Sequence, residues 1–355
     1  MTGKTWIIYG AYGYTGVLVA DEALRRGHTP VLAGRSADKL VPLAERLGLD
    51  HVAIDLEDED DLAKTVAGFD LVFHAAGPFI HTSAPMVRAC LKGDTNYVDI
   101  TGEVAVFEQN LSYDQQTRQK GIAVMSGVGF DVIPSDCMAK YVADRVVDPT
   151  QLELAIASTG IPSAGTIKTV LEHIPKGILV RRNGRLVRYP PGKEARRIRF
   201  VDRERTVLPV SWGDLATAYR TTGIPNITTF MAFPERTASF MRWVAPLSQN
   251  LLAIGPIRRL LQKSIEKIVH GPDEHTRQTA RSYLWARAAN EKGDECQVWL
   301  ETLEGYYFTA VAGVRCVERI FAERPQGVLT PAVAFGADFV LEIPGTKRYD
   351  QLNTL

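Results

Sequence analysis

Short apolar runs alternate with longer amphipathic stretches through the first 125 residues of the chain. The apolar runs have the length of buried strands and fall at 6–9, 29–33, 52–54, 70–74, 96–99 and 122–125. Between them, apolar side chains recur at helical spacing at 15–26, 40–47, 58–66, 82–92 and 104–119. Strands alternating with helices predict an α/β fold with a doubly wound parallel (Rossmann) sheet. Ligands of such sheets bind at the carboxyl ends of the strands, so candidate chemistry is expected there.

The pattern changes beyond residue 150. Residues 152–159 read as a strand, 166–174 and most of 236–270 as helix, and 282–289 with 295–302 as two strands of a hairpin. Asn183-Gly184 is a second hairpin signal. The apolar positions of 236–270 could roof a pocket, form a dimer face or touch a membrane surface. A chain of 355 residues suits two domains.

The first turn of the sheet is rich in glycine. Gly10, Gly13 and Gly16 lie between the first strand and the first helix. They allow a tight turn, a close approach to a pyrophosphate and close packing of helix on strand, while the helix N-terminus attracts phosphate. The spacing is G-x-x-G-x-x-G, so the flanking strand and helix carry the inference, against an alternative of a glycine-rich turn without a ligand. The residues expected to bind the cofactor here are Gly10, Tyr12, Gly13, Tyr14, Thr15 and Gly16, although the two tyrosines could equally pack on the helix.

The end of the second strand distinguishes between the two nicotinamide cofactors. An acid there binds the ribose 2′-hydroxyl of NAD, whereas an arginine suits the 2′-phosphate of NADP. This chain has Arg35, Ser36 and, one turn later, Lys39. A guanidinium binds phosphate through two parallel hydrogen bonds, so we expect NADP(H). Asp55, at the end of the third strand, is either an adenine-side contact or part of a helix start.

Small residues follow the fourth strand. Ala75, Ala76, Gly77 and Pro78 leave room for ribose or nicotinamide against the backbone, although Gly-Pro also makes an ordinary turn. Their position on the ligand edge of the sheet favours cofactor binding.

Four polar residues follow the fifth and sixth strands. Tyr97 and Asp99 share one face of a strand, Glu103 begins the next helix, and Asp131 lies in the loop after the sixth strand. An acid beside a nicotinamide could pass a proton if burial raised its pKa, and Tyr97 could donate a proton or orient the substrate. The alternative is that these residues stabilise the site without contacting the substrate: Asp99 could cap a turn, and Glu103 could cap a helix.

Composition narrows the class of protein. Lys and Arg total 41, as do Asp and Glu, which gives no reason to expect nucleic acid as a partner. The four cysteines show no metal-ligand spacing and predict reduced thiols, a cytoplasmic protein and no metal site. We expect no signal peptide, since the first strand follows Met1 closely, and no transmembrane segment. The arginine-rich stretch 181–205 is either a patch for an acidic partner or a solvated hairpin face.

Several of these motifs together resemble one family. Gly10-AYGYTG, Ala33-GRS, Ala75-AGPF, Tyr97-VDITGE and Gly127-VGFDVIPSD, with Gly305-YYFTAVAGVRCVERIF and Gly327-VLTPAVAFG near the end, resemble the saccharopine dehydrogenase-like reductases and their branch of trans-acting enoyl reductases. The resemblance implies NADPH and a nucleotide-binding domain at 1–130 completed by a C-terminal helix within 305–355. It also implies an inserted α/β substrate-binding and dimerisation domain at 131–304. Asp131 matches an aspartate that holds amino-acid substrates in some members, but Gly127 replaces the accompanying acid.

Three functions remain open on this basis. The leading hypothesis is an NADPH-dependent oxidoreductase that reduces an activated C=C (enoyl or enone) or C=N (imine) bond of a small-to-medium apolar substrate, free or carrier-tethered. The second is a saccharopine-type amino-acid C–N dehydrogenase, disfavoured by Gly127. The third is a non-catalytic NADP(H)-binding scaffold or sensor. Pairing of the inserted sheet across a two-fold axis would make a homodimer.

Overall fold

The computed structural model describes residues 3–158, 177–189, 195–236 and 272–352. The chain divides into two compact units, one of Met1–Ile133 with Tyr306–Phe339 and the other of Pro134–Gly305 with Val340–Leu355. The helices expected at 166–174 and across most of 236–270 lie outside the described residues. None of the helices in the described ranges has the length and apolar character needed to cross a membrane.

The first unit is built on a seven-stranded sheet in the order β15-β6-β5-β4-β1-β2-β3. Every neighbouring pair in it is parallel. The doubly wound Rossmann sheet predicted from the alternating pattern is therefore confirmed, with its topological switch point between β1 and β4. Its strands are β1 Trp6–Tyr9, β2 Val31–Gly34, β3 His51–Ala53, β4 Leu71–His74, β5 Asn96–Asp99, β6 Ala123–Met125 and β15 Gly327–Val328.

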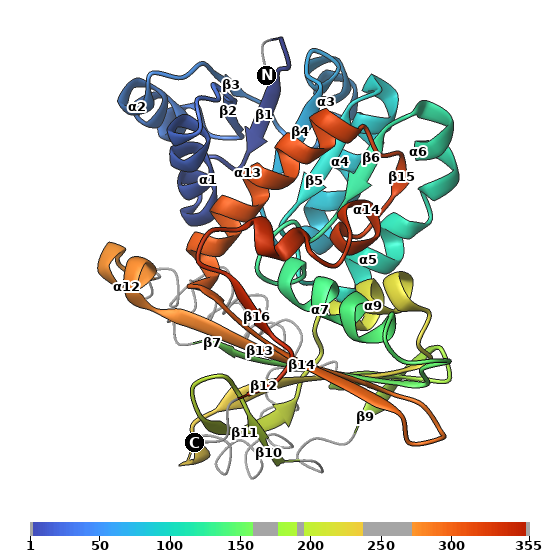
Figure 1. Ribbon diagram of the computed structural model, residues 1–355. Coiled ribbons are helices and arrows are strands. Elements are labelled where there is room, and N and C mark those ends of the chain that lie inside the picture. Colours follow the sequence, from blue (N-terminus) through green and yellow to red (C-terminus); the bar gives the residue numbers. More distant parts are fainter. Residues whose placement is uncertain (1–2, 159–176, 190–194, 237–271, 353–355) are drawn as a thin grey trace. The chain divides into compact units, whose positions relative to one another are not determined.

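Helices cover this sheet because its strands are apolar on both faces. Ile7, Tyr9, Val72 and Tyr97 belong to a core cluster with side chains of α3 and α4, while Phe73 approaches α13 at Gly313 on the other face. In Figure 1, α13 is the long orange helix of this unit. The helices are α1 Tyr14–Arg25, α2 Ala37–Leu47, α3 Glu59–Val66, α4 Phe79–Gly93, α5 Val104–Leu111, α6 Asp114–Lys120, α13 Gly305–Glu323 and α14 Pro331–Phe335. The 3₁₀ turn η2 Phe339–Glu342 begins at the last residue of this unit.

Two helices differ from the sequence prediction. α4 begins at Phe79 rather than at residue 82, because its first turn is capped from another part of the chain. The helix expected over 104–119 is two helices, α5 and α6. They separate at Ser112, whose hydroxyl donates to the carbonyl of Gln109 at 2.7 Å and so competes with the helical ladder.

The second unit contains a nine-stranded sheet in the order β10-β11-β12-β7-β13-β14-β16, in which β8 also pairs with β12 and β9 pairs with β8. Among the described strands of this unit, only β7 and β12 pair in parallel, so its sheet is mixed. Its strands are β7 Gln151–Ser158, β8 Ile178–Arg182, β9 Arg185–Tyr189, β10 Arg196–Arg199, β11 Glu204–Pro209, β12 Asn226–Phe233, β13 Arg281–Ala289, β14 Glu295–Leu303 and β16 Lys347–Tyr349. Its helices are α7 Ile133–Ala143, which begins at the boundary of the first unit, α9 Asp214–Thr222 and α12 Glu274–Thr279.

Both predicted hairpins form. Asn183 and Gly184 join β8 to β9 with φ values of +48° and +76°, as a tight primed turn requires. β13 and β14 pair over their whole lengths.

The end of the chain departs from expectation. Residues 305–355 were expected with the first unit, but Val340–Leu355 belong to the second. The reason is that β16 adds to the sheet of the second unit, with Tyr349 opposite Trp299.

Candidate active site

The glycine turn is so closely packed that side chains are excluded from it. A Cβ added to Gly16 would lie 2.3 Å from the carbonyl oxygen of Gly10, and one added to Gly10 would lie 2.8 Å from the backbone nitrogen of Ala76. Gly10 also has a φ of +86°, which glycine adopts without strain. The turn after β1 and the loop after β4, which the sequence assigned separately to the cofactor, are therefore in contact.

The N-terminus of α1 is suited to an anion. Gly13 is its N-cap, no side chain caps it, and no acidic residue lies in its first turn. The first turn and the dipole of this helix thus favour a phosphate, with no side-chain cap or carboxylate of the turn to oppose it. The two tyrosines of the turn point to different neighbours: the Tyr12 ring lies against Gly34, and the Tyr14 ring meets Tyr306 of α13 edge-on at 5.0 Å between centroids.

Two cations lie at the end of β2. Arg35 and Lys39 are exposed, and no carboxylate in the described part of the chain forms an ion pair with either. The Lys39 ammonium is 5.5 Å from the centroid of the Tyr12 ring. Ser36 is the N-cap of α2, and its hydroxyl makes no capping bond. These groups fit a ribose 2′-phosphate, because they offer two positive charges, a hydroxyl and a helix N-terminus without a side-chain cap.

Asp55 lies beside the same region. It is exposed at the end of β3, and its Oδ1 accepts a hydrogen bond from the Glu57 N–H at 3.2 Å. Burial, and then the charges of Asp55 and Tyr12, raise the pKa of Tyr9 to about 12, against a lowering effect of Arg35. An adenine-side role for Asp55 stays a prediction.

The loop after β4 is held in shape by side chains outside it. The Gly77-Pro78 peptide is cis. The Thr82 hydroxyl donates to the carbonyl of Ala76 at 2.7 Å, and the Ala75 N–H donates to the backbone carbonyl of Tyr9 at 2.7 Å. Binding of ribose or nicotinamide by residues 75–78 stays a prediction.

Tyr97 and Asp99 are fully buried and bonded to each other. The Tyr97 hydroxyl donates to Oδ2 of Asp99 at 2.8 Å. The Asp99 carboxylate also accepts from the N–H of Thr101, the N–H of Gly127 and the hydroxyl of Ser126, at 3.0, 3.0 and 2.9 Å. Burial raises the pKa of Asp99 to about 6 in spite of these bonds. Burial also raises the pKa of Tyr97 well above that of an ordinary tyrosine. The geometry favours a positioning role for both residues, one of the two alternatives that the sequence left open.

Glu103 caps a helix, but not the helix that it precedes. Its two carboxylate oxygens accept the backbone N–H groups of Phe79 and Ile80 at 2.9 and 3.2 Å, and it is 3% exposed. It therefore closes the N-terminus of α4 from the loop that follows β5, immediately after the predicted cofactor loop.

Asp131 is the predicted acid that remains partly exposed. Burial of its carboxyl raises its pKa to about 6. It packs against Gly102, where an added Cβ would lie 3.0 Å from Oδ2 of Asp131. Its raised pKa and partial exposure suit a group that exchanges a proton near neutral pH.

Sequence reasoning missed a buried polar network behind these residues. Nδ1 of His74 lies 3.1 Å from the Tyr97 hydroxyl, and Asn110 donates to the hydroxyls of Ser83 and Ser126 at 3.0 and 2.9 Å. Burial lowers the pKa of His74 to about 3, so this imidazole is neutral at working pH. The position of His74 at the end of β4 was the available signal.

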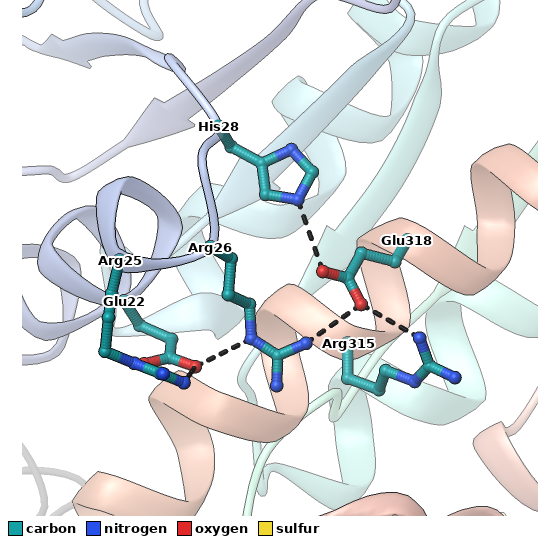
Figure 2. A network of polar contacts seen from close by, with 6 residues as sticks. All are labelled: Glu22, Arg25, Arg26, His28, Arg315 and Glu318. Carbon is teal, nitrogen blue, oxygen red and sulfur yellow. Dashed lines mark hydrogen bonds and ion pairs between the residues drawn. The ribbon is translucent and has the colours of Figure 1, made fainter. Parts of the chain in front are cut away.

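A second polar network that sequence reasoning missed joins the end of α1 to α13, which lies almost 300 residues later in the chain. Figure 2 shows Arg26 between two carboxylates: it donates to Glu22 at 2.7 Å and to Glu318 of α13 at 2.9 Å. Glu318 also accepts from Arg315 at 3.0 Å and lies 3.3 Å from Nε2 of His28. The network fixes α13 to the C-terminal end of α1, the helix whose N-terminus forms the phosphate site.

The strand order, the switch point and the glycine turn define a dinucleotide-binding domain of the oxidoreductase type. Residues 6–125 match the family model of the saccharopine dehydrogenase NADP binding domain. The resemblance found in the motifs is thus confirmed for this part of the chain, and the matched model, an NADP-binding domain, supports NADP(H) as the cofactor.

Curated relatives and one solved structure agree with this assignment. The chain is 30% identical over 181 residues to a trans-acting enoyl reductase of Mycobacterium tuberculosis, covering 47% of this chain and 43% of the relative. It is 28% identical over 163 residues to a saccharopine dehydrogenase-like oxidoreductase of Bos taurus, covering 39% and 37%. Each match therefore spans less than half of the relative's length. Apo saccharopine dehydrogenase (L-Glu forming) from Saccharomyces cerevisiae shares the fold, with a TM-score of 0.65 at 12% identity over 98% of this chain and 100% of that one.

Proposed function

We propose that this protein is an NADPH-dependent oxidoreductase that reduces an activated C=C bond (enoyl or enone) or a C=N bond (imine) of a small-to-medium apolar substrate. The observation that carries the proposal is the N-terminus of α1, which has no side-chain cap and follows a turn of closely packed glycines. Two cations, Arg35 and Lys39, follow the neighbouring strand β2, and neither forms an ion pair within the described part of the chain. This arrangement supports a dinucleotide that bears a 2′-phosphate.

The chain's own residues would divide the work between them. NADPH supplies the hydride when bound. The first turn of α1 would hold the pyrophosphate, Arg35 and Lys39 the 2′-phosphate, and residues 75–78 the ribose and nicotinamide end. Hydride addition to an enoyl or imine group leaves negative charge on carbon, oxygen or nitrogen, and a proton must follow. Asp131 is the acid best suited to provide it, since burial raises its pKa to about 6.

Two measurements test the proposal in order. Titration of the protein with NADPH, followed by the fluorescence of the dihydronicotinamide, should give saturable binding that is much stronger than for NADH. Oxidation of NADPH is then followed at 340 nm against a panel of enones, enoyl thioesters and cyclic imines. Saturable binding without turnover of any member would favour the scaffold or sensor.

A saccharopine-type amino-acid substrate fits this chain less well. Gly127 occupies the position of the acid that accompanies Asp131 in the members that act on amino acids. Gly127 has a φ of +77°, and an added Cβ would lie 2.5 Å from the Val132 side chain. No acidic side chain fits there without rearrangement of the loop, so turnover of an amino acid with an α-keto acid would contradict our proposal.

The second unit offers a contact for an acidic carrier. Many arginines of the 181–205 stretch are engaged: Arg181 donates to the Leu215 carbonyl at 2.6 Å, and Arg205 pairs with Asp202. Arg185 and Arg188, on β9, are exposed and have no ion pair in the described part of the chain. We propose this strand as the docking edge for a carrier-tethered substrate. The test compares the reduction rates of a carrier-bound substrate and its free thioester in the wild type and in the double variant Arg185→Glu/Arg188→Glu. If the two substrates react at equal rates in both proteins, docking of a carrier on this strand is excluded.

Two further assignments follow from the sequence and belong to the same proposal. The expected homodimer through the second sheet is part of this proposal, and light scattering tests it. The four cysteines are free, as expected for a cytoplasmic protein, and fractionation of the source cell tests the location.

A further inference from the structure

The turn at residues 99–103, Asp-Ile-Thr-Gly-Glu, is fixed by its own side chains. The N–H of Thr101 donates to Oδ1 of Asp99 at 3.0 Å, and the N–H of Glu103 donates to the Thr101 hydroxyl at 3.1 Å. Both carboxylates of the turn are buried. A turn closed in this way holds its two acidic side chains in fixed directions.

One of these acids reaches the loop after β6. Asp99 accepts the Gly127 N–H at 3.0 Å and the Ser126 hydroxyl at 2.9 Å, while its carbonyl accepts the Val128 N–H at 2.7 Å. These bonds fix the start of the segment that carries Asp131, the proposed proton donor.

The other acid reaches the start of α4. Pro78, the N-cap of α4, has no side-chain capping group, and Glu103 supplies the missing acceptors to Phe79 and Ile80. Because Phe79 follows Pro78 directly, these bonds also fix the end of the predicted cofactor loop 75–78. Between the two acids, Gly102 leaves the space that the Asp131 carboxylate occupies.

We propose that the turn at 99–103 is a positioning clamp, in which Glu103 sets the cofactor loop and Gly102, with Asp99, sets the proton donor Asp131. The inference rests on the proposed function. It replaces direct catalysis by Asp99 and Glu103 with a role in which each acts through the backbone of another loop. It also assigns separate effects to the two ends of one five-residue turn.

Cofactor affinity tests the first end of the clamp. Glu103→Ala removes both acceptors and should weaken NADPH binding about tenfold or more, because hydrogen bonds to a charged group contribute about 1.5–3 kcal/mol and about 1.4 kcal/mol equals tenfold. Glu103→Gln keeps one carbonyl acceptor and should restore part of the affinity. The matched control is Asp273→Ala, which removes a carboxylate that caps α12 of the other unit through Thr276 at 2.8 Å. This control should bind NADPH within twofold of wild type.

Turnover tests the second end. Gly102→Ala places a methyl group against Asp131 and should lower kcat about tenfold or more, while the NADPH dissociation constant stays within twofold of wild type. A merely structural role for the turn would lower the melting temperature of both variants without separating affinity from turnover.

The possible results separate the clamp from the proposed function. Wild-type protein that fails to bind NADPH would contradict the function itself. Folded Glu103→Ala that binds NADPH as wild type does would overturn the clamp and leave the function standing. If Glu103→Ala does not fold, Glu103→Gln provides the same test, because it removes the charge and one of the two acceptors that hold Phe79 and Ile80. Wild-type NADPH affinity in folded Glu103→Gln would likewise overturn the clamp.

Discussion

Replacement of Arg26 by methionine should destabilise the first unit, because this guanidinium joins two buried carboxylates. Glu22 is 4% exposed and Glu318 is 9% exposed, and Arg26 donates to them at 2.7 and 2.9 Å. Methionine keeps much of the apolar stem and removes the charge. The change therefore tests whether the network in Figure 2 holds α13 on α1.

The magnitude follows from what each carboxylate retains. A hydrogen bond to a charged group contributes about 1.5–3 kcal/mol, and breaking a buried ion pair outright costs about 3–5 kcal/mol. Glu22 keeps Arg25 at 2.6 Å and Glu318 keeps Arg315 at 3.0 Å, so neither charge is left without a partner. The lower end of each range applies, which gives a loss of about 3 kcal/mol. For a unit of this size that corresponds to a melting temperature lower by about 6–12 °C.

Differential scanning calorimetry measures this loss, with NADPH addition identifying the transition of the cofactor-binding unit. The matched control is Arg46→Met. Arg46 also joins α1 to a neighbouring helix, but its Asp21 partner is 3.8 Å away and the side chains are 54% and 47% exposed. An exposed pair of this kind contributes about 0.5 kcal/mol or less. If Arg26→Met melts within about 2 °C of Arg46→Met, the network does not hold the helix and the reasoning fails.

Three further outcomes are expected. Arg35→Ala and Lys39→Ala should each weaken NADPH binding about tenfold while leaving NADH binding within twofold, as measured by fluorescence titration; unchanged preference in both would remove the 2′-phosphate assignment. Gly16→Ala should weaken NADPH binding more than about tenfold, since its methyl group would lie 2.3 Å from the Gly10 carbonyl oxygen; full affinity would show that the turn is looser than this. Burial raises the pKa of Asp131 to about 6, so the folded protein binds its proton more tightly than the unfolded chain does, and stability should fall as pH rises from about 4 to about 6. Asp131→Asn should remove that part of the fall in denaturant titrations, and in the wild type kcat should decrease above about pH 6 if this acid gives the proton.

Six of the seven strands of the first sheet could be predicted because each has a local signal, whereas β15, with two residues, has none. Runs such as Trp6–Tyr9 are buried at every position, as the strands of a covered parallel sheet must be. Helix starts were less certain. α4 was expected to begin three residues later than it does, because nothing near Phe79 in the sequence shows that Glu103 completes its first turn.

The network of Figure 2 could not be predicted for a related reason. Glu22, Arg25 and Arg26 have the spacing of an ordinary exposed helix end, and Glu318 with Arg315 has the same spacing on another helix. Their burial arises only when the two helices pack together, with almost 300 residues of chain between them. Likewise, the three residues of β16 carry no sequence pattern that assigns them to the second sheet. Their place in that sheet depends on pairing with β14.

The carboxylates near the ends of strands show most clearly why the role of a residue could not be inferred from its position in the sequence alone. Three of the helices that follow a strand in the first unit illustrate this. The N-terminus of α3 is closed by Asp58, which accepts the Asp61 N–H at 3.0 Å, and that of α4 is closed by Glu103. The N-terminus of α1 has no side-chain cap and no acid in its first turn. An anion would meet like charge at the first two helices and only N–H groups at the third, so the same type of residue that suggested catalysis directs the phosphates to the glycine turn.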